Sequence, residues 1–187
     1  MRRVRYPVAC SLDGYIAGPH GEYDWIIMDP EIDFDALFSQ FDTLLMGRRT
    51  FELMQGQGGP WSGMRTVVFS RTMGAADHPE VEVVASDPGA AVAALKAEGG
   101  KDIWLFGGGE LFRSLLAEGC VDSVEPAVIP VLLGGGIPLL PSPAVQRSLE
   151  LTGHRVFKSG IVLLEYAVKQ PAKRRSRRGT ARRRVSD

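Results

Sequence analysis

The sequence predicts an α/β domain with a central mixed sheet of about eight strands, flanked by about four helices. Strand-like and helix-like segments alternate along the chain, several apolar strand segments end directly in glycine, and the chain closes on two strand-like segments around a short turn. Alternation favours an α/β organisation, and a closing antiparallel hairpin makes the sheet mixed. With 187 residues and 44% hydrophobic residues, the chain can bury a substantial core.

The first half of the chain predicts four strands, at residues 4–10, 43–46, 66–70 and 81–85. Between the first two, the residues Phe34, Leu37, Phe38 and Phe41 recur at the spacing of one helix face, which predicts a helix that includes Phe41. A second helix is expected to begin directly after Gly47. Asp87 as N-cap and Pro88 at the first helical position predict a third helix, which ends at Gly99.

The second half begins with a strand at 103–106, which runs into three glycines. A fourth helix follows, with its buried face marked by Leu111, Phe112, Leu115 and Leu116 and its end by Gly119. Residues 123–133 are strand-rich, and the segments 149–157 and 161–168 predict the closing hairpin.

The charge of the chain is unevenly distributed, although the net charge is zero. Residues 171–187 hold eight basic residues and one acidic residue, a net charge of +7, so the remaining chain carries −7. Because this segment has few apolar residues, we expect a disordered basic tail after a folded domain of residues 1–170. The tail could contact polyanions weakly and without specificity.

Two cysteines, Cys10 and Cys120, provide neither a disulfide framework nor a four-ligand zinc pattern, so no metal site is predicted. No apolar run reaches the length of a membrane span, and the N-terminus lacks the apolar core of a signal peptide. These features predict a cytoplasmic protein that does not bind membranes.

Three strand ends carry groups suited to phosphate binding. Gly107-Gly108-Gly109 lies between a strand and a helix, where glycines permit close approach and the helix N-terminus favours an anion. Gly47-Arg48-Arg49-Thr50 is a second such junction, and Ser70-Arg71 ends a third strand. Each motif alone could be a tight turn or an ordinary surface charge. Together, at the carboxyl ends of strands in one sheet, they suggest a ligand with several phosphates.

The order of these motifs, after the start Ser11-Leu12-Asp13-Gly14, resembles the dihydrofolate reductase-like superfamily. Within it, the segment 129–136 (IPVLLGGG) is similar to the reductase domain of the bifunctional riboflavin-biosynthesis deaminase/reductase and its stand-alone relatives. The resemblance covers about residues 3–169. It implies an NADPH-dependent reductase, similar to 5-amino-6-(5-phosphoribosylamino)uracil reductase, and a homodimer built partly from residues 123–168.

The resemblance also implies roles for particular residues. The adenosine 2′-phosphate and the neighbouring phosphates would lie at Arg48, Arg49, Ser70 and Arg71, beside Gly47. The pyrophosphate would lie at Thr50, Gly107, Gly108, Gly109, Glu110 and Leu111, with a cis peptide between Gly107 and Gly108. Ala9 and Ile16 would lie near the nicotinamide.

The substrate is less defined, because two features of the riboflavin reductases are missing. Pro7 stands where they commonly carry a lysine, and Trp25 is followed by Ile26-Ile27-Met28 rather than by their Ser/Arg pattern for the substrate phosphate. The zinc-deaminase motif Pro-Cys-x-x-Cys does not occur either. A pyrimidine or pterin-like heterocycle is expected. Dihydrofolate is the enzymatic alternative, and a catalytically silent nucleotide-binding protein with a tail that contacts nucleic acid is the alternative of another class.

A carboxylate before the first helix is the candidate catalytic group. Glu31 or Asp33 could support protonation of the substrate while hydride arrives from the nicotinamide. Acidic residues also crowd this helix start, where the helix dipole favours them without any catalytic role.

Overall fold

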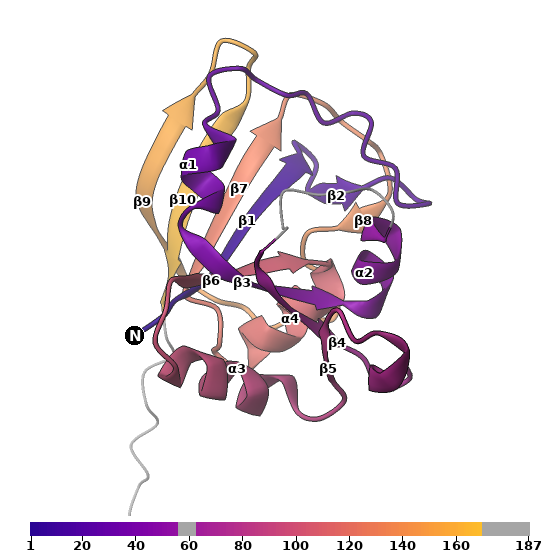
Figure 1. Cartoon of the computed structure of the whole chain (residues 1–187). Helices are drawn as coiled ribbons and strands as arrows, with labels where there is room; N and C mark the ends of the chain where they lie inside the picture. Colours follow the sequence, from indigo (N-terminus) through magenta and orange to yellow (C-terminus); the bar gives the residue numbers. More distant parts are fainter. Residues whose placement is uncertain (56–62, 170–187) are drawn as a thin grey trace, which may run out of the picture.

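The computed structural model describes residues 1–55 and 63–169, and these form an eight-stranded mixed sheet with helices packed on it, together with a small two-stranded sheet (Figure 1). The predicted tail at residues 171–187 lies outside the described residues.

The elements follow the predicted alternation. The strands are β1 (Val4–Ser11), β2 (Tyr15–Ala17), β3 (Phe41–Gly47), β4 (Arg65–Phe69), β5 (Glu82–Val84), β6 (Asp102–Gly107), β7 (Ser123–Ile129), β8 (Ile137–Pro138), β9 (Leu149–Val156) and β10 (Val162–Val168). The helices are α1 (Phe34–Phe38), α2 (Arg48–Met54), α3 (Pro88–Ala97) and α4 (Gly109–Ala117), with a 3₁₀ turn at Ala75–Asp77.

The main sheet has the strand order β5-β4-β3-β6-β1-β7-β10-β9. The six strands from β5 to β7 run parallel, whereas β10 pairs antiparallel with both β7 and β9. The closing hairpin therefore makes the sheet mixed, as predicted. Strands β2 and β8 pair antiparallel in the small sheet, which the sequence did not predict.

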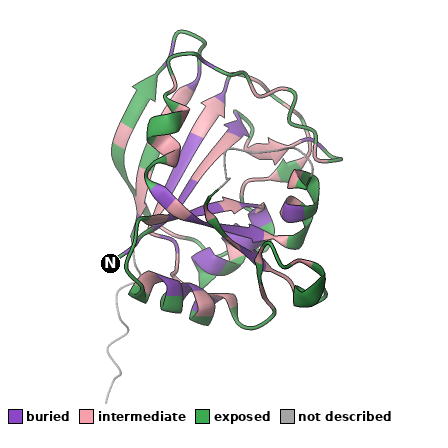
Figure 2. Ribbon diagram, in the orientation of Figure 1, coloured by how far each residue is buried: buried purple, intermediate pink, exposed green. Residues whose placement is uncertain are grey.

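The sheet buries apolar side chains on both faces, and many residues of its central strands are buried (Figure 2). On one face, Tyr6, Leu45 and Leu105 pack with Phe112 and Leu115 of α4, in a core that also includes α3. On the other face, Phe41, Leu44 and Trp104 form a second core with side chains of α1 and α2, which are Leu37, Phe38 and Phe51. Two covered faces explain why the parallel strands read as continuous apolar runs.

The predicted extension of the first helix to Phe41 is wrong. Helix α1 ends at Phe38, and Phe41 is the first residue of β3, where it pairs with Asp102. Phe38 and Phe41 both contact the Trp104 ring, with centroids 5.4 and 5.3 Å away. The helical spacing in the sequence thus reflects a shared aromatic cluster that spans the helix, its end and the next strand.

The predicted strand at 123–133 is also shorter than expected. It ends at Ile129, because Pro130 has no N–H for a ladder, and the following residues turn toward β1, where the Leu12 N–H donates to the Val131 carbonyl at 2.9 Å. The loop that follows β7 therefore lies against the end of β1.

Candidate functional site

The strand ends that carry the phosphate-binding motifs lie side by side. In the register of the sheet, Met46 pairs with Gly107, and Gly47 pairs with Phe69. The residues that follow β3, β4 and β6 therefore meet at one edge, as the parallel arrangement predicts. The Gly107–Gly108 peptide is cis, as the resemblance implies.

A cavity of about 660 Å³ opens at this edge, and we call it the strand-end cavity. Its lining residues come from the ends of β3, β4 and β5 and from the first turns of α3 and α4; they are Gly47, Phe69, Ser70, Arg71, Val84, Ala85, Ser86, Asp87, Pro88, Glu110, Leu111, Arg113 and Ser114. Five of the predicted cofactor residues are in this set: Gly47, Ser70, Arg71, Glu110 and Leu111.

The strand-end cavity offers donors to an anion. Arg71 is exposed and makes no hydrogen bond or ion pair with the residues that the structure describes. The Ser70 hydroxyl oxygen accepts from the N–H groups of Thr72 and Met73, at 3.3 and 3.0 Å, and its proton remains available. Helix α4 begins at Gly109, so its first N–H groups face the same edge.

Other predicted cofactor residues do not line the strand-end cavity. Arg48 donates to Glu52 at 2.6 Å and to Thr72 at 2.8 Å. Arg49 is exposed on α2, and Ile16 lies on β2. Thr50 is close to Gly108, because a Cβ built at Gly108 would lie 3.4 Å from the Thr50 hydroxyl. Roles for these side chains in cofactor binding stay predictions.

A second cavity, of about 440 Å³, lies between α1 and the sheet, and we call it the α1 cleft. Most of its lining is apolar: Pro7, Val8, Ala9, Ile26, Ile27, Met28, Ile32, Phe34, Ala36, Leu37, Phe38, Trp104, Phe106, Ala127, Ile129, Phe157, Ile161 and Leu163. The polar and charged lining residues are Arg5, Asp33, Gln40, Glu125, Arg155 and Glu165. Ala9, predicted near the nicotinamide, is part of this wall.

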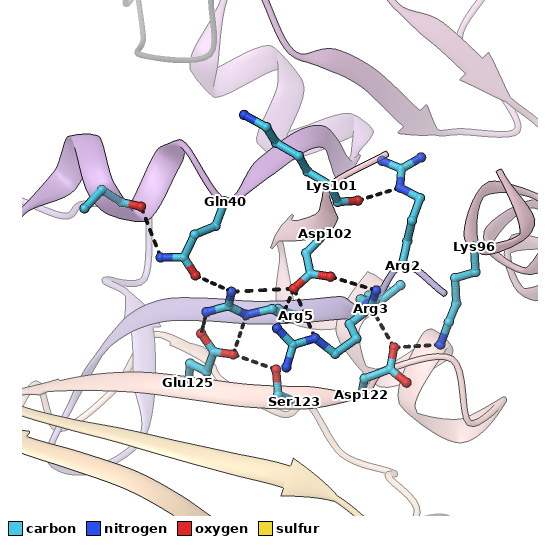
Figure 3. Close-up of polar contacts among 12 residues, drawn as sticks. Arg2, Arg3, Arg5, Gln40, Lys96, Lys101, Asp102, Asp122, Ser123 and Glu125 are labelled. Carbon is cyan, nitrogen blue, oxygen red and sulfur yellow. Dashed lines mark hydrogen bonds and ion pairs between the residues drawn. The ribbon is translucent and has the colours of Figure 1, made fainter. Parts of the chain in front are cut away.

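The polar floor of the α1 cleft is a buried ion pair. Arg5 donates through Nε and Nη2 to the two carboxylate oxygens of Glu125, at 2.8 and 2.6 Å, and through Nη1 to Gln40 at 2.6 Å (Figure 3). Ser123 donates to the same carboxylate at 2.6 Å. Arg5 is 9% exposed and Glu125 is 7% exposed. The hydrogen bonds to Glu125 raise the pKa of the Arg5 guanidinium, so Arg5 stays positively charged.

Strand register explains how this pair forms. Arg5, Pro7 and Ala9 alternate along β1 and point to one face, and β7 pairs alongside with Ser123 opposite Arg5 and Glu125 opposite Pro7. Sequence reasoning did not single out Arg5 or Glu125. The available signal was a charged residue inside each of two apolar strands, where an unpaired charge would be costly.

The two candidate catalytic carboxylates have different positions. Asp33 lines the α1 cleft and caps α1 by accepting from the Ala36 N–H at 2.8 Å. Glu31 is outside the lining and lies near Arg155 at 3.6 Å and Lys158 at 3.4 Å. Of the two, Asp33 is the one that could reach a ligand in the cleft.

Asp13 has a structural role at the end of β1. It accepts from Ser11 at 2.6 Å and from the backbone N–H groups of Leu133 and Gly134, at 3.1 and 2.7 Å. The Ser11 hydroxyl, followed by these N–H groups, holds the pKa of Asp13 below its ordinary value. As a carboxylate, Asp13 ties the end of β1 to the loop after β7.

No helix in the described part of the chain is long and apolar enough to cross a membrane. Among residues 1–55 and 63–169, no group of three or more His, Cys, Asp and Glu side chains is placed to hold a metal ion.

The sheet order, the antiparallel closing hairpin and the glycine-rich junction at β6 and α4 define a dihydrofolate reductase-like fold. The chain belongs to the RibD C-terminal domain family, whose model matches residues 2–163. Its fold is therefore that of the reductase domains of riboflavin biosynthesis.

Individual relatives agree with this family. The uncharacterized protein YyaP of Bacillus subtilis is 36% identical over 179 residues, which cover 88% of this chain and 94% of that protein. A putative riboflavin biosynthesis protein from Shewanella sp. PV-4 is 28% identical, with a TM-score of 0.78, and the match covers 90% of this chain and 99% of that one.

A more distant match gives the fold alone. The diaminohydroxyphosphoribosylaminopyrimidine deaminase/5-amino-6-(5-phosphoribosylamino)uracil reductase of Thermotoga maritima is 19% identical, with a TM-score of 0.68. The match covers 90% of this chain but 57% of that longer chain.

Proposed function

We propose that this protein is an NADPH-dependent reductase of the riboflavin-reductase type, which transfers hydride to a pyrimidine or pterin-like heterocycle. The observation that carries the proposal is the strand-end cavity, where Arg71 and Ser70 lie at the same sheet edge as Gly47 and the start of α4. Membership of a family of reductase domains supports it.

The residues of the strand-end cavity fit a phosphorylated dinucleotide. A Cβ built at Gly47 would meet no atom within 4 Å, so the backbone at this point is open to a ligand. The guanidinium of Arg71 suits a terminal phosphate, and the N–H groups at the start of α4 suit a pyrophosphate. NADPH carries both groups, and NADH lacks the 2′-phosphate.

In this proposal the two cavities have different roles, one for the cofactor phosphates and one for the substrate ring. NADPH, when bound, supplies the hydride. The strand-end cavity would bind and orient its phosphates, while Ala9 in the wall of the α1 cleft would lie near the nicotinamide, beside the substrate ring. The apolar walls of the cleft would exclude water from the transfer.

Asp33 is the proposed source of a proton. It belongs to the lining of the α1 cleft, and its carboxylate is fixed at the start of α1 by the Ala36 N–H. A group placed in this way can relay a proton to a ring nitrogen as hydride adds elsewhere on the ring.

The direct test has two steps. NADPH and NADH are titrated against the protein by fluorescence, and NADPH oxidation is then followed with pyrimidines, pterins and dihydrofolate as substrates. Tight NADPH binding with turnover of a pyrimidine or pterin supports the proposal. Turnover of dihydrofolate would identify a dihydrofolate reductase. NADPH binding without turnover of any substrate would favour the catalytically silent alternative, and failure to bind NADPH would overturn the proposal.

A further inference from the structure

Both guanidinium groups that line the α1 cleft have a carboxylate beside them. Arg5 is held by Glu125 through two hydrogen bonds of 2.8 and 2.6 Å. Arg155 lies 3.6 Å from Glu31, with its guanidinium 4.4 Å from the centroid of the Phe157 ring. Each of these positive charges therefore already lies beside a negative one.

The charged side chains that line the cleft have a negative balance. Two guanidinium groups, Arg5 and Arg155, stand against the three carboxylates of Asp33, Glu125 and Glu165. Lys158 and Glu31, which contact each other at 3.4 Å beside Arg155, add one charge of each sign. A phosphate that entered would lose its water and meet an excess of negative charge.

The charged lining of the strand-end cavity is balanced: Arg71 and Arg113 stand against Asp87 and Glu110, and Arg113 pairs with Glu110. Arg71 makes no hydrogen bond or ion pair within the described part of the chain, and the Ser70 hydroxyl lies beside it. Anion-binding chemistry is thus concentrated in one cavity, and the α1 cleft has apolar and aromatic walls, among them Leu37, Phe38 and Trp104, which suit a flat ring.

The floor of the α1 cleft can still recognise a polar ring edge. One carboxylate oxygen of Glu125 accepts from both Arg5 and Ser123, whereas the other, among the residues that the structure describes, accepts from Arg5 alone. The second oxygen has capacity for one more donor, such as a ring N–H or an amino group.

We propose that the substrate of this protein is an uncharged planar heterocycle that carries no phosphate, with an N–H edge directed at Glu125. This inference rests on the proposed function, since it names the substrate class of the same site. This substrate class excludes the phosphoribosyl compound that appears in the name of the Thermotoga maritima protein.

The test compares matched pairs that differ by one phosphate, uridine with uridine 5′-monophosphate and riboflavin with flavin mononucleotide. Affinities are measured by calorimetry or, for the flavins, by fluorescence, on the full chain without NADPH. We expect the uncharged member of at least one pair to bind, about tenfold or more tightly than its phosphate. Equal or tighter binding of the phosphates would overturn the proposal, and so would failure of both uncharged compounds to bind.

A charge-neutral variant gives an independent check. Glu31→Gln removes the carboxylate beside Arg155 and Lys158 but keeps the shape of an exposed side chain. We expect it to tighten binding of the phosphorylated members about threefold or more, in a salt-dependent way, with the uncharged members unchanged. An unchanged preference in Glu31→Gln would contradict the charge argument.

The matched control is Glu82→Gln, because Glu82 also pairs with an arginine, Arg65, but lies on β5, at the edge of the sheet opposite β9. Glu82→Gln should change the affinity for neither member of a pair. NADPH affinity, measured separately, distinguishes the two proposals: loss of NADPH binding rejects the reductase, whereas intact NADPH binding with a preference for phosphates rejects only the uncharged substrate.

Discussion

At the residue scale, the proposed preference for NADPH over NADH rests on Arg71. It lines the strand-end cavity beside Ser70, and no described residue neutralises it. We expect Arg71→Ala to weaken the binding of NADPH by about 1–3 kcal/mol, the range for one charged contact, and to leave the binding of NADH almost unchanged. Titration of both cofactors measures the difference.

The control for Arg71 is Arg3→Ala, which removes an exposed arginine that pairs with Asp102 near the N-terminal ends of the strands. It should change neither affinity. Equal losses of NADPH and NADH in Arg71→Ala would place the 2′-phosphate elsewhere.

Asp33 allows a proton-transfer role to be separated from a capping role. Asn is as good an N-cap as Asp, so Asp33→Asn should preserve α1 while removing the acid. We expect kcat to fall about 100-fold, the lower end for loss of a general acid, with little change in melting temperature. Steady-state kinetics and thermal unfolding of the same preparation provide the two measurements.

Asp35→Asn is the matched control, because Asp35 lies in the first turn of α1 but does not line the α1 cleft. It should retain full turnover. If the two variants behave alike, the carboxylate at position 33 does not serve in proton transfer.

At the scale of elements, the junction of β3 and α2 determines how closely a ligand can approach the sheet. Gly47 is the N-cap of α2 with φ −79°, and a Cβ there would enter open space. Gly47→Ala should therefore lower the free energy of unfolding by at most about 1 kcal/mol. The methyl group would project into the strand-end cavity and weaken the binding of NADPH at least tenfold.

Gly99→Ala offers a comparison for Gly47→Ala. Gly99 also has no atom within 4 Å of a built Cβ, but it follows α3 and lines neither cavity. Thermal unfolding and NADPH titration of both variants should show a binding loss at Gly47 alone. Unimpaired binding in Gly47→Ala would mean that no ligand contacts this strand end.

At the scale of the whole molecule, the homodimer remains a prediction, and within residues 123–168 we expect its surface at β9. The other two long strands of this half, β7 and β10, have partners on both sides. The edge strand β9 instead exposes Leu149, Leu151 and Val156 at 42, 51 and 66%. An apolar edge of this kind favours pairing with another chain.

We expect light scattering at micromolar concentration to give twice the mass of one chain, and Leu151→Lys to shift the protein toward the monomer. Leu53→Lys is the control, because Leu53 is equally exposed, at 51%, but lies on α2. A wild-type monomer, or dissociation by both variants alike, would argue against an interface at β9.

The sequence by itself determined most of the elements and the sheet edge at which the phosphate-binding motifs meet. Local signals suffice there: glycine after an apolar strand ends the strand, Asp87-Pro88 starts a helix, and parallel strands bring their carboxyl ends to one edge. Gly47, Ser70, Arg71, Glu110 and Leu111 could therefore be grouped before any coordinates were known, and these five residues line one cavity.

The α1 cleft and the ion pair at its floor became visible only in the tertiary structure. Arg5 and Glu125 are 120 positions apart, and the register of β1 against β7 brings them into contact. In the same way, Phe41 fits a helical spacing in the sequence but belongs to β3, because its ring packs against Trp104 from a neighbouring strand. Pairing register and side-chain packing between distant segments are not local properties, so the Arg5–Glu125 floor of the cleft could be found only in the folded chain.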